Sequence, residues 1–158
     1  MVEYSVGVNA TSNTSVNTED TFVELSGVII KVKRVEVRMG DGTATGELDN
    51  AFRVRLVRKT AGGATGTGGT AVRLKQEDRT SGATVNVKNG TAAFTTATLG
   101  DVVYTQVVNG RQQFQWMPRD DDEIIQTHST LGSGGMFAVL IQSAVVSQKF
   151  QVNVLWAE

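Results

Sequence analysis

The sequence predicts an all-β protein, a single-domain antiparallel sandwich of about eight strands. Val, Thr and Gly together make up more than a third of its 158 residues. Residues branched at Cβ favour strands and Gly favours turns. Several segments alternate apolar and polar residues with a period of two, which is typical of a half-buried strand. We find no stretch of ten or more residues with the 3.6-residue period of an amphipathic helix, and the length fits one domain.

The first twenty residues are expected to lie outside the sandwich. Residues Asn9–Asp20 read NATSNTSVNTED and contain little that could be buried. They could form a frayed terminus or an extended arm that becomes ordered against a neighbouring subunit. The predicted organisation is therefore a polar N-terminal arm over residues 1–20 and a sandwich domain over residues 21–158.

The first predicted strands are Phe22–Leu25 and Val28–Met39. In the second of them the apolar positions change parity at Lys33–Arg34. A period of two cannot change parity without an extra residue, so we predict a β-bulge or a bend there. Three shorter strands should follow, at Phe52–Arg58, Ala71–Lys75 and Thr84–Lys88. Their inward side chains are expected to be Phe52, Val54, Leu56, Val72, Leu74, Val85 and Val87.

The segment from Asp101 to Met117 is predicted to form a hairpin around Asn109 and Gly110. Asn-Gly suits a type I′ turn because both central residues need a positive φ. The side chains expected on its buried face are Val103, Thr105, Val107, Phe114 and Trp116.

Three strands complete the predicted sandwich. Ile124–Thr127 is short. Met136–Ile141 is continuously apolar and should lie in the centre of a sheet. Lys149–Trp156 alternates strictly, and its predicted inward side chains are Phe150, Val152, Val154 and Trp156.

The composition leaves little for catalysis, so we expect no enzymatic activity and no cofactor. The chain contains no Cys and only one His, His128, and shows no G-x-S-x-G motif. The densest acidic run, Asp120–Glu123, is expected to be a solvated loop, with a weak cation site or an intersubunit salt bridge as alternatives. We assign no catalytic, cofactor or metal residues.

The charge pattern bears on which partners the protein could bind, and the first residues bear on where it is synthesised. A formal net charge of −1 provides no general attraction for nucleic acid or anionic membranes. Ten of the fifteen positive residues lie between Lys31 and Lys75. If Arg53, Arg55, Arg73 and Lys75 share an outward face, that face could dock on an acidic protein. The first residues show no secretory signal and the longest apolar run is too short to span a membrane, so we expect synthesis in the cytoplasm.

The order of these segments resembles the jelly-roll capsid decoration (cement) proteins of tailed bacteriophages. The resemblance covers Phe22 to Glu158. It rests on the polar lead-in, on VIIKVKRVEVRMGDGTATGELDNAFRVRLVRKTAGGATGTGG, on DVVYTQVVNGRQQFQW and on the closing FQVNVLWAE. It implies a homotrimer of jelly rolls on the outside of an assembled head. There the protein would bridge major capsid protein subunits and stabilise the lattice by binding it but not loose subunits.

By position, the residues expected at this interface are Val6, Val8 and Val16 in the arm and Arg34 at the bend. Two alternatives remain. One is another phage structural module: a head fibre base, a tail tip or a coat subunit. The other is a carbohydrate-binding sandwich, which would present exposed aromatic rings. Here Trp116 and Trp156 are predicted to be core, and only Tyr4 and Tyr104 are expected to be exposed.

Overall fold

The computed structural model describes residues 1–12, 18–40, 50–59, 66–75, 79–89, 101–120, 125–127, 135–144 and 148–158. These residues form strands and connections and no helix. The strands are β1 (Glu3–Thr11), β2 (Glu19–Ser26), β3 (Lys31–Met39), β4 (Ala51–Lys59), β5 (Thr67–Gly68), β6 (Val72–Arg73), β7 (Thr84–Val87), β8 (Val102–Asn109), β9 (Phe114–Trp116), β10 (Ile125–Gln126), β11 (Met136–Ser143) and β12 (Lys149–Ala157).

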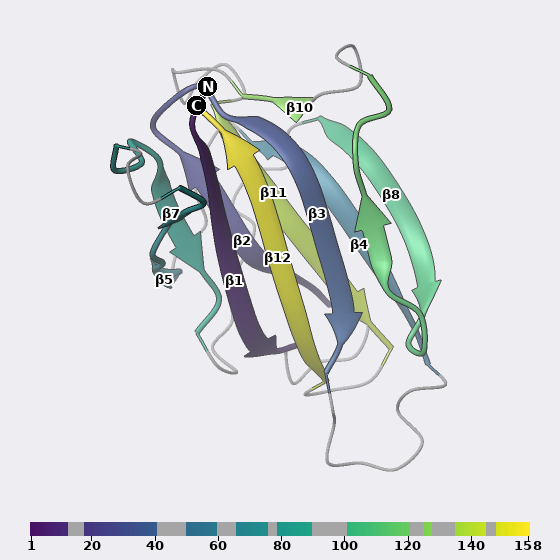
Figure 1. The fold of residues 1–158 in the computed structure, drawn as a ribbon. Coiled ribbons are helices and arrows are strands. Elements are labelled where there is room, and N and C mark those ends of the chain that lie inside the picture. The colour runs from purple at the N-terminus through teal and green to yellow at the C-terminus, as the bar shows by residue number, and fades with distance from the viewer. Residues whose placement is uncertain are drawn as a thin grey trace.

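Two antiparallel sheets pack face to face (Figure 1). Sheet A has the order β10-β3-β12-β1-β6, and β9 also pairs with β3. Sheet B has the order β5-β7-β2-β11-β4-β8. The first and last long strands are neighbours, and the chain crosses between the sheets from β1 to β2, from β2 to β3 and from β3 to β4. β1, β12, β3 and β9 face β2, β11, β4 and β8, which is the connectivity of a jelly roll. The predicted all-β jelly-roll sandwich is confirmed.

The β-bulge predicted at Lys33–Arg34 is confirmed. Leu155 of β12 lies opposite Arg34, and the next residue, Trp156, lies opposite Val32, so Lys33 is the extra residue. The bulge lets Val32 and Val35 both point into the core, where each is fully buried. β11 lies between β2 and β4, in the centre of sheet B as expected.

The predicted N-terminal arm is wrong over residues 3–11, because this segment is β1. It pairs with β12 from Glu3 opposite Ala157 to Thr11 opposite Lys149. The alternation that marks β1 as a strand starts before the polar stretch, with Tyr4, Val6 and Val8 all buried. Pairing with β12 engages the backbone of Asn9–Thr11 along one side of β1, although the side chains of Asn9 and Thr11 are polar. Residues 13–17 lie outside the described part of the chain.

The predicted hairpin at Asn109 and Gly110 is also wrong, although a turn does occur there. Gln112 donates its backbone N–H to the Asn109 carbonyl at 2.9 Å. β8 then pairs with β4, whereas β9 pairs with β3 in the other sheet. The turn therefore carries the chain between the sheets. As a result Phe114 and Trp116 are buried, as expected, while Val103 and Val107 are exposed.

Three further burial predictions fail. Val72 and Leu74 are exposed, because β6 is a two-residue edge strand that meets β1 only at Tyr4 and Ser5. Tyr4 is fully buried: it stacks on Trp156 with ring centroids 5.8 Å apart and donates its hydroxyl to the Arg79 carbonyl at 2.9 Å.

Candidate docking surfaces

The outer face of sheet A is polar and hollowed. One hollow of about 370 Å³ is lined by Asn9, Arg38, Met39, Gly40, Lys149 and Gln151. A second of about 290 Å³ is lined by Glu36, Arg38, Gln113, Gln151 and Asn153. Arg38 donates its Nε–H to Gln151 Oε1 between them. Both linings offer hydrogen-bonding groups, but neither includes an aromatic ring on which a sugar could stack.

The outer face of sheet B is buried along its central strands. Val57, Ala138 and Leu140 form a second apolar cluster, and each is fully buried. Beside it, Lys59 of β4 donates to Glu24 of β2 across β11, and both side chains are at most 1% exposed. Such a pair is held by mutual charge in a site from which water is excluded.

A second buried ion pair joins β2 to the end of β7. The Lys88 Nζ lies 3.2 Å from Asp20 Oδ1, with both side chains at most 1% exposed. The same ammonium lies 5.8 Å from the centre of the Phe22 ring. The backbone N–H of Lys88 also donates to the Phe22 carbonyl at 3.0 Å. These contacts fix the rim of sheet B, so the charged groups are structural.

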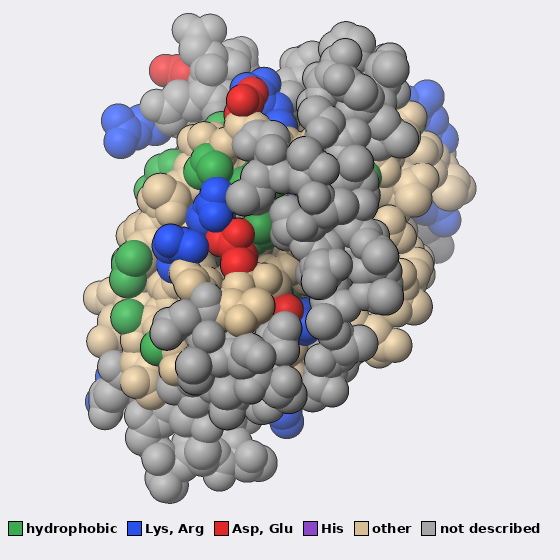
Figure 2. Space-filling model, turned by 180° about the vertical axis from the view of Figure 1, so that it is seen from behind, with side chains coloured by type: hydrophobic (Ala, Val, Ile, Leu, Met, Phe, Trp, Pro, Cys, Tyr) green, Lys and Arg blue, Asp and Glu red, His purple; other side chains and the backbone are tan. Residues whose placement is uncertain are grey.

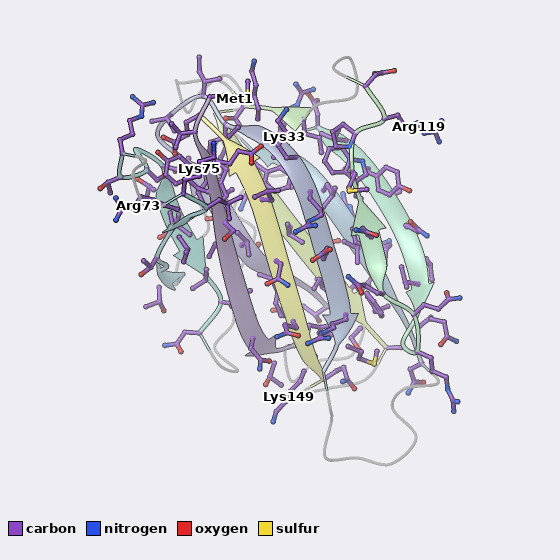
Figure 3. The ribbon with its side chains drawn as sticks, in the orientation of Figure 1. Met1, Lys33, Arg73, Lys75, Arg119 and Lys149 are labelled. Atoms are coloured by element: carbon purple, nitrogen blue, oxygen red, sulfur yellow. The ribbon has the colours of Figure 1, made fainter. Side chains whose placement is uncertain are left out.

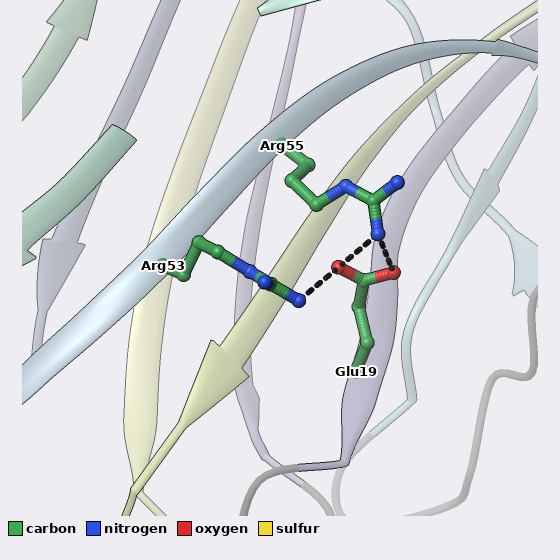
Figure 4. Close-up of polar contacts among 3 residues, drawn as sticks. All are labelled: Glu19, Arg53 and Arg55. Atoms are coloured by element: carbon green, nitrogen blue, oxygen red, sulfur yellow. Dashed lines mark hydrogen bonds and ion pairs between the residues drawn. The ribbon is translucent and has the colours of Figure 1, made fainter. Parts of the chain in front are cut away.

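Glu19 binds two arginines on the outer side of sheet B (Figure 4). Arg55 Nη1 lies 3.0 Å and 3.1 Å from the two carboxylate oxygens, and Arg53 Nη2 lies 3.4 Å from one of them. Seen from behind, acidic and basic side chains lie side by side on this face (Figure 2). The single Glu19 carboxylate therefore offsets one of the two guanidinium charges.

The basic face predicted from Arg53, Arg55, Arg73 and Lys75 does not form. Arg53 and Arg55 lie on β4 of sheet B, whereas Arg73 lies on β6 of sheet A. Arg73 and Lys75 lie near one corner of the sandwich, far from Arg119 and Lys149 (Figure 3). Sequence proximity suggested neighbouring strands, but the jelly roll separates β4 and β6 into different sheets.

Among the described residues, exposed large apolar side chains gather at two edges, and Met1, Ile29 and Met117 are exposed elsewhere. β8, the last strand of sheet B, exposes Val102, Val103, Tyr104 and Val107. Val72 in β6 and Leu74 just after it are exposed at the edge of sheet A that β6 forms. Nothing in the sequence pattern distinguished these valines from core residues, because alternation does not say which face of an edge strand is covered.

The interface residues predicted by position differ in whether they are accessible. Val6 and Val8 point into the core and are 3% and 8% exposed, so neither can dock on another protein. Arg34 stays accessible beside the bulge, where its side chain is 44% exposed and its Nε lies 3.5 Å from Glu36 Oε1. Val16 lies outside the described residues. Of the reactive groups considered, His128 and Asp121–Glu123 also lie outside them.

The C-terminal residue closes the sandwich beside the N-terminus. Glu158 exchanges backbone hydrogen bonds with Val2, and its carboxylate accepts from the Ser81 hydroxyl, from the N–H groups of Gly82 and Ala83, and from the Trp156 indole. Burial opposes its ionisation, but these hydrogen bonds together outweigh burial and lower the pKa of the Glu158 carboxyl. This carboxylate therefore connects the end of β12 to the segment Ser81–Ala83.

Within the described residues, His, Asp and Glu form no group of three that could hold a metal ion. The same part of the chain contains no helix that is long and apolar enough to cross a membrane. The described charged groups that are buried serve in ion pairs between strands. The arrangement is therefore suited to contacts through faces and edges.

No family model matches the sequence, and no curated protein matches it. Among solved structures, the fold is similar to a chain in the three-dimensional structure of Cocksfoot mottle virus. The TM-score is 0.35 and the sequence identity 7%, over 98% of this chain and 91% of that chain.

Proposed function

We propose that this chain is a structural component of a virus particle, a decoration protein on the outside of a tailed-bacteriophage head. It would bind major capsid protein subunits in the assembled shell and stabilise their contacts. The observation that carries the proposal is the jelly-roll connectivity, since this fold builds viral capsid proteins. The order of segments from Phe22 to Glu158, which resembles the decoration proteins, supports the finer role.

The chemistry of the described residues agrees with an adhesive role. Glu24 and Glu19 are each held by a basic side chain of β4 across β11, and Asp20 is held by Lys88 just beyond β7, so these carboxylates are engaged in holding the sandwich together. What the surface offers instead is the polar face of sheet A and the apolar strand β8. A homotrimer and a position on the outer surface, after assembly in the host cytoplasm, stay predictions of the resemblance.

Binding to emptied heads tests the proposal. The purified chain should co-sediment with heads that lack it and should raise the temperature at which they disassemble, because a ligand of the assembled lattice stabilises it by mass action. Arg34→Glu should weaken this binding, and Lys75→Glu, at the corner of the sandwich beside β6 (Figure 3), is the matched control. Failure to bind heads under conditions where the chain is folded would contradict the proposal.

A carbohydrate-binding role is the second candidate, and the polar hollows around Arg38 and Gln151 favour it. Tyr104 is exposed, as predicted, but lies on β8 rather than beside these hollows. A glycan array would support this role if Arg38→Ala abolished a positive signal. Another phage structural module, such as a fibre base, tail tip or coat subunit, would be recognised by electron microscopy of the particle.

A further inference from the structure

Among the described strands, β8 is the last of sheet B, at the rim opposite β5 and β7 (Figure 1). One side of β8 pairs with β4 from Val102 to Asn109, and no described strand pairs with its other side. The Gly110 N–H donates to the Asn50 carbonyl at 2.8 Å. Since backbone groups alternate sides along a strand, those of Thr105, Val107 and Asn109 are directed away from β4.

The side chains of this edge are also unprotected. Val107 is 66% exposed, and Val102, Val103 and Tyr104 are 44%, 39% and 37% exposed. The strand reads VVYTQVVN and contains no charged residue and no Pro. Natural proteins usually block a long edge strand with Lys, Pro or a covering segment, because an open edge pairs with other chains. β8 has a bulge at Val103, where its register with β4 shifts, but from Tyr104 to Asn109 it pairs regularly with β4 and none of the described residues blocks it. This part of the edge is therefore open to pairing.

We propose that two copies of this chain pair antiparallel through β8 across a two-fold axis. The occupant of the edge is thus a second copy, and the two six-stranded B sheets become continuous. A two-fold contact requires a surface that complements itself. β8 meets this requirement because it is uncharged along its length and carries opposite charges just beyond its two ends. This inference does not depend on the proposed attachment to a phage head.

The charges at the ends of β8 select the register. Asp101 precedes the strand, with its side chain 80% exposed, and Arg111 follows it and is also exposed. When Gln106 lies opposite Gln106 of the second copy, the end of β8 that carries Asp101 in each chain lies beside the end that carries Arg111 in the other. The same register places Thr105 opposite Val107, so that two residues with outward backbone groups meet. Charge and hydrogen bonding therefore favour one alignment.

The mass of the purified full-length chain in solution tests the pairing. Light scattering coupled to size exclusion should give twice the chain mass of 16.9 kDa. Val107→Lys should convert the dimer to a monomer, because it places ammonium groups at the buried edge. Val72→Lys is the matched control, since it changes an exposed valine on the opposite edge and should leave the dimer intact. Circular dichroism verifies that both variants are folded.

Charge exchange tests the register. Asp101→Arg and Arg111→Asp should each raise the dissociation constant of the dimer, and the two changes together should restore it. Restoration is specific to a contact between these positions in different chains, because loss of the exposed Asp101–Arg58 pair within one chain could not be rescued by changing Arg111.

Several outcomes would overturn the proposal. A wild-type mass of one or three chains would do so, and three would favour the trimer that the resemblance implies. A Val107→Lys variant that stays dimeric would exclude β8 from the contact. A monomeric chain that binds heads, and loses that binding on Val107→Lys, would assign the edge to a shell subunit and leave the proposed function standing.

Discussion

The outer faces of the two sheets differ in how far they are buried, as a comparison of the central strands β12 and β11 shows. In β12 of sheet A the buried residues Phe150, Val152 and Val154 alternate with Gln151 and Asn153. In β11 of sheet B every residue from Met136 to Ile141 is buried. One face of β12 borders polar hollows, whereas both faces of β11 are covered. A strand that alternates apolar and polar residues therefore indicates a sheet with one face exposed to solvent. A continuously apolar strand indicates a sheet that is buried on both faces.

Among the described residues, both buried ion pairs lie in sheet B, which also carries exposed pairs such as Arg58–Asp101. In sheet A, Arg34 and Glu36 lie 3.5 Å apart at the surface. In sheet B, Lys59 and Glu24 are hidden from solvent. Exposed pairs contribute little because water and salt screen them, but removing one partner of a buried pair leaves a charge without compensation. The four predictions below use this contrast, beginning with the largest expected effect.

Deleting Glu36 should prevent folding. Val35 and Val37 would become neighbours, so that the strand beyond this point would turn its apolar side chains to the wet face of sheet A. Deleting Lys33 is the matched control, because it removes the bulge residue and keeps Val32 and Val35 pointing inward. Yield of folded protein and near-ultraviolet circular dichroism measure the result. Equal tolerance of both deletions would contradict the importance of parity in sheet A.

Lys59→Met should lower the free energy of unfolding by about 3–5 kcal/mol, because it leaves the Glu24 carboxylate buried without its cation. Replacing both partners, with Glu24→Leu added, should restore most of the loss. Arg34→Met in sheet A should change the free energy by less than about 1 kcal/mol. Urea unfolding followed by fluorescence measures all three, and similar losses for Lys59→Met and Arg34→Met would refute the contrast.

Leu140→Ala should cost about 2–5 kcal/mol, because the side chain is fully buried on the outer side of sheet B. Leu155→Ala is the matching change on the outer side of sheet A, where the leucine is only partly buried. Its cost should be about 1 kcal/mol or less. The urea midpoints at unchanged slope report both values. A larger loss at Leu155 would mean that the outer face of sheet A is covered as well.

The smallest effect is expected at Glu158, a partly exposed carboxylate at the end of β12. Its lowered pKa means that its ionised form stabilises the folded chain above the unfolded-state pKa of about 4.3, and that this contribution is lost as pH falls through the folded-state pKa. Glu158→Gln should therefore lower Tm slightly at pH 7. The two Tm values should converge in acid, and a difference that persists at low pH would contradict this role.

The sequence predicted the class of the fold and much of its local detail, because periodicity is a local property. The alternation in β12, the apolar run in β11 and the parity change at Lys33–Arg34 all led to correct strands, including the bulge. Each signal depends only on which side of a strand must face the core. The same reasoning failed for residues 3–11, where a polar stretch concealed the second half of a paired strand.

Partners in space were decided only by the tertiary structure. Asn109 and Gly110 form a turn, as their types require, but the chain there passes to the other sheet, so that β8 pairs with β4 and β9 pairs with β3. The candidate edge on β8, the buried Lys59–Glu24 pair and the loss of Val6 and Val8 as interface residues follow from that long-range pairing. Residue types determine where strands begin and which of their side chains face the core. The packing of the two sheets determines which strands pair, since pairing depends on contacts between residues far apart in the chain.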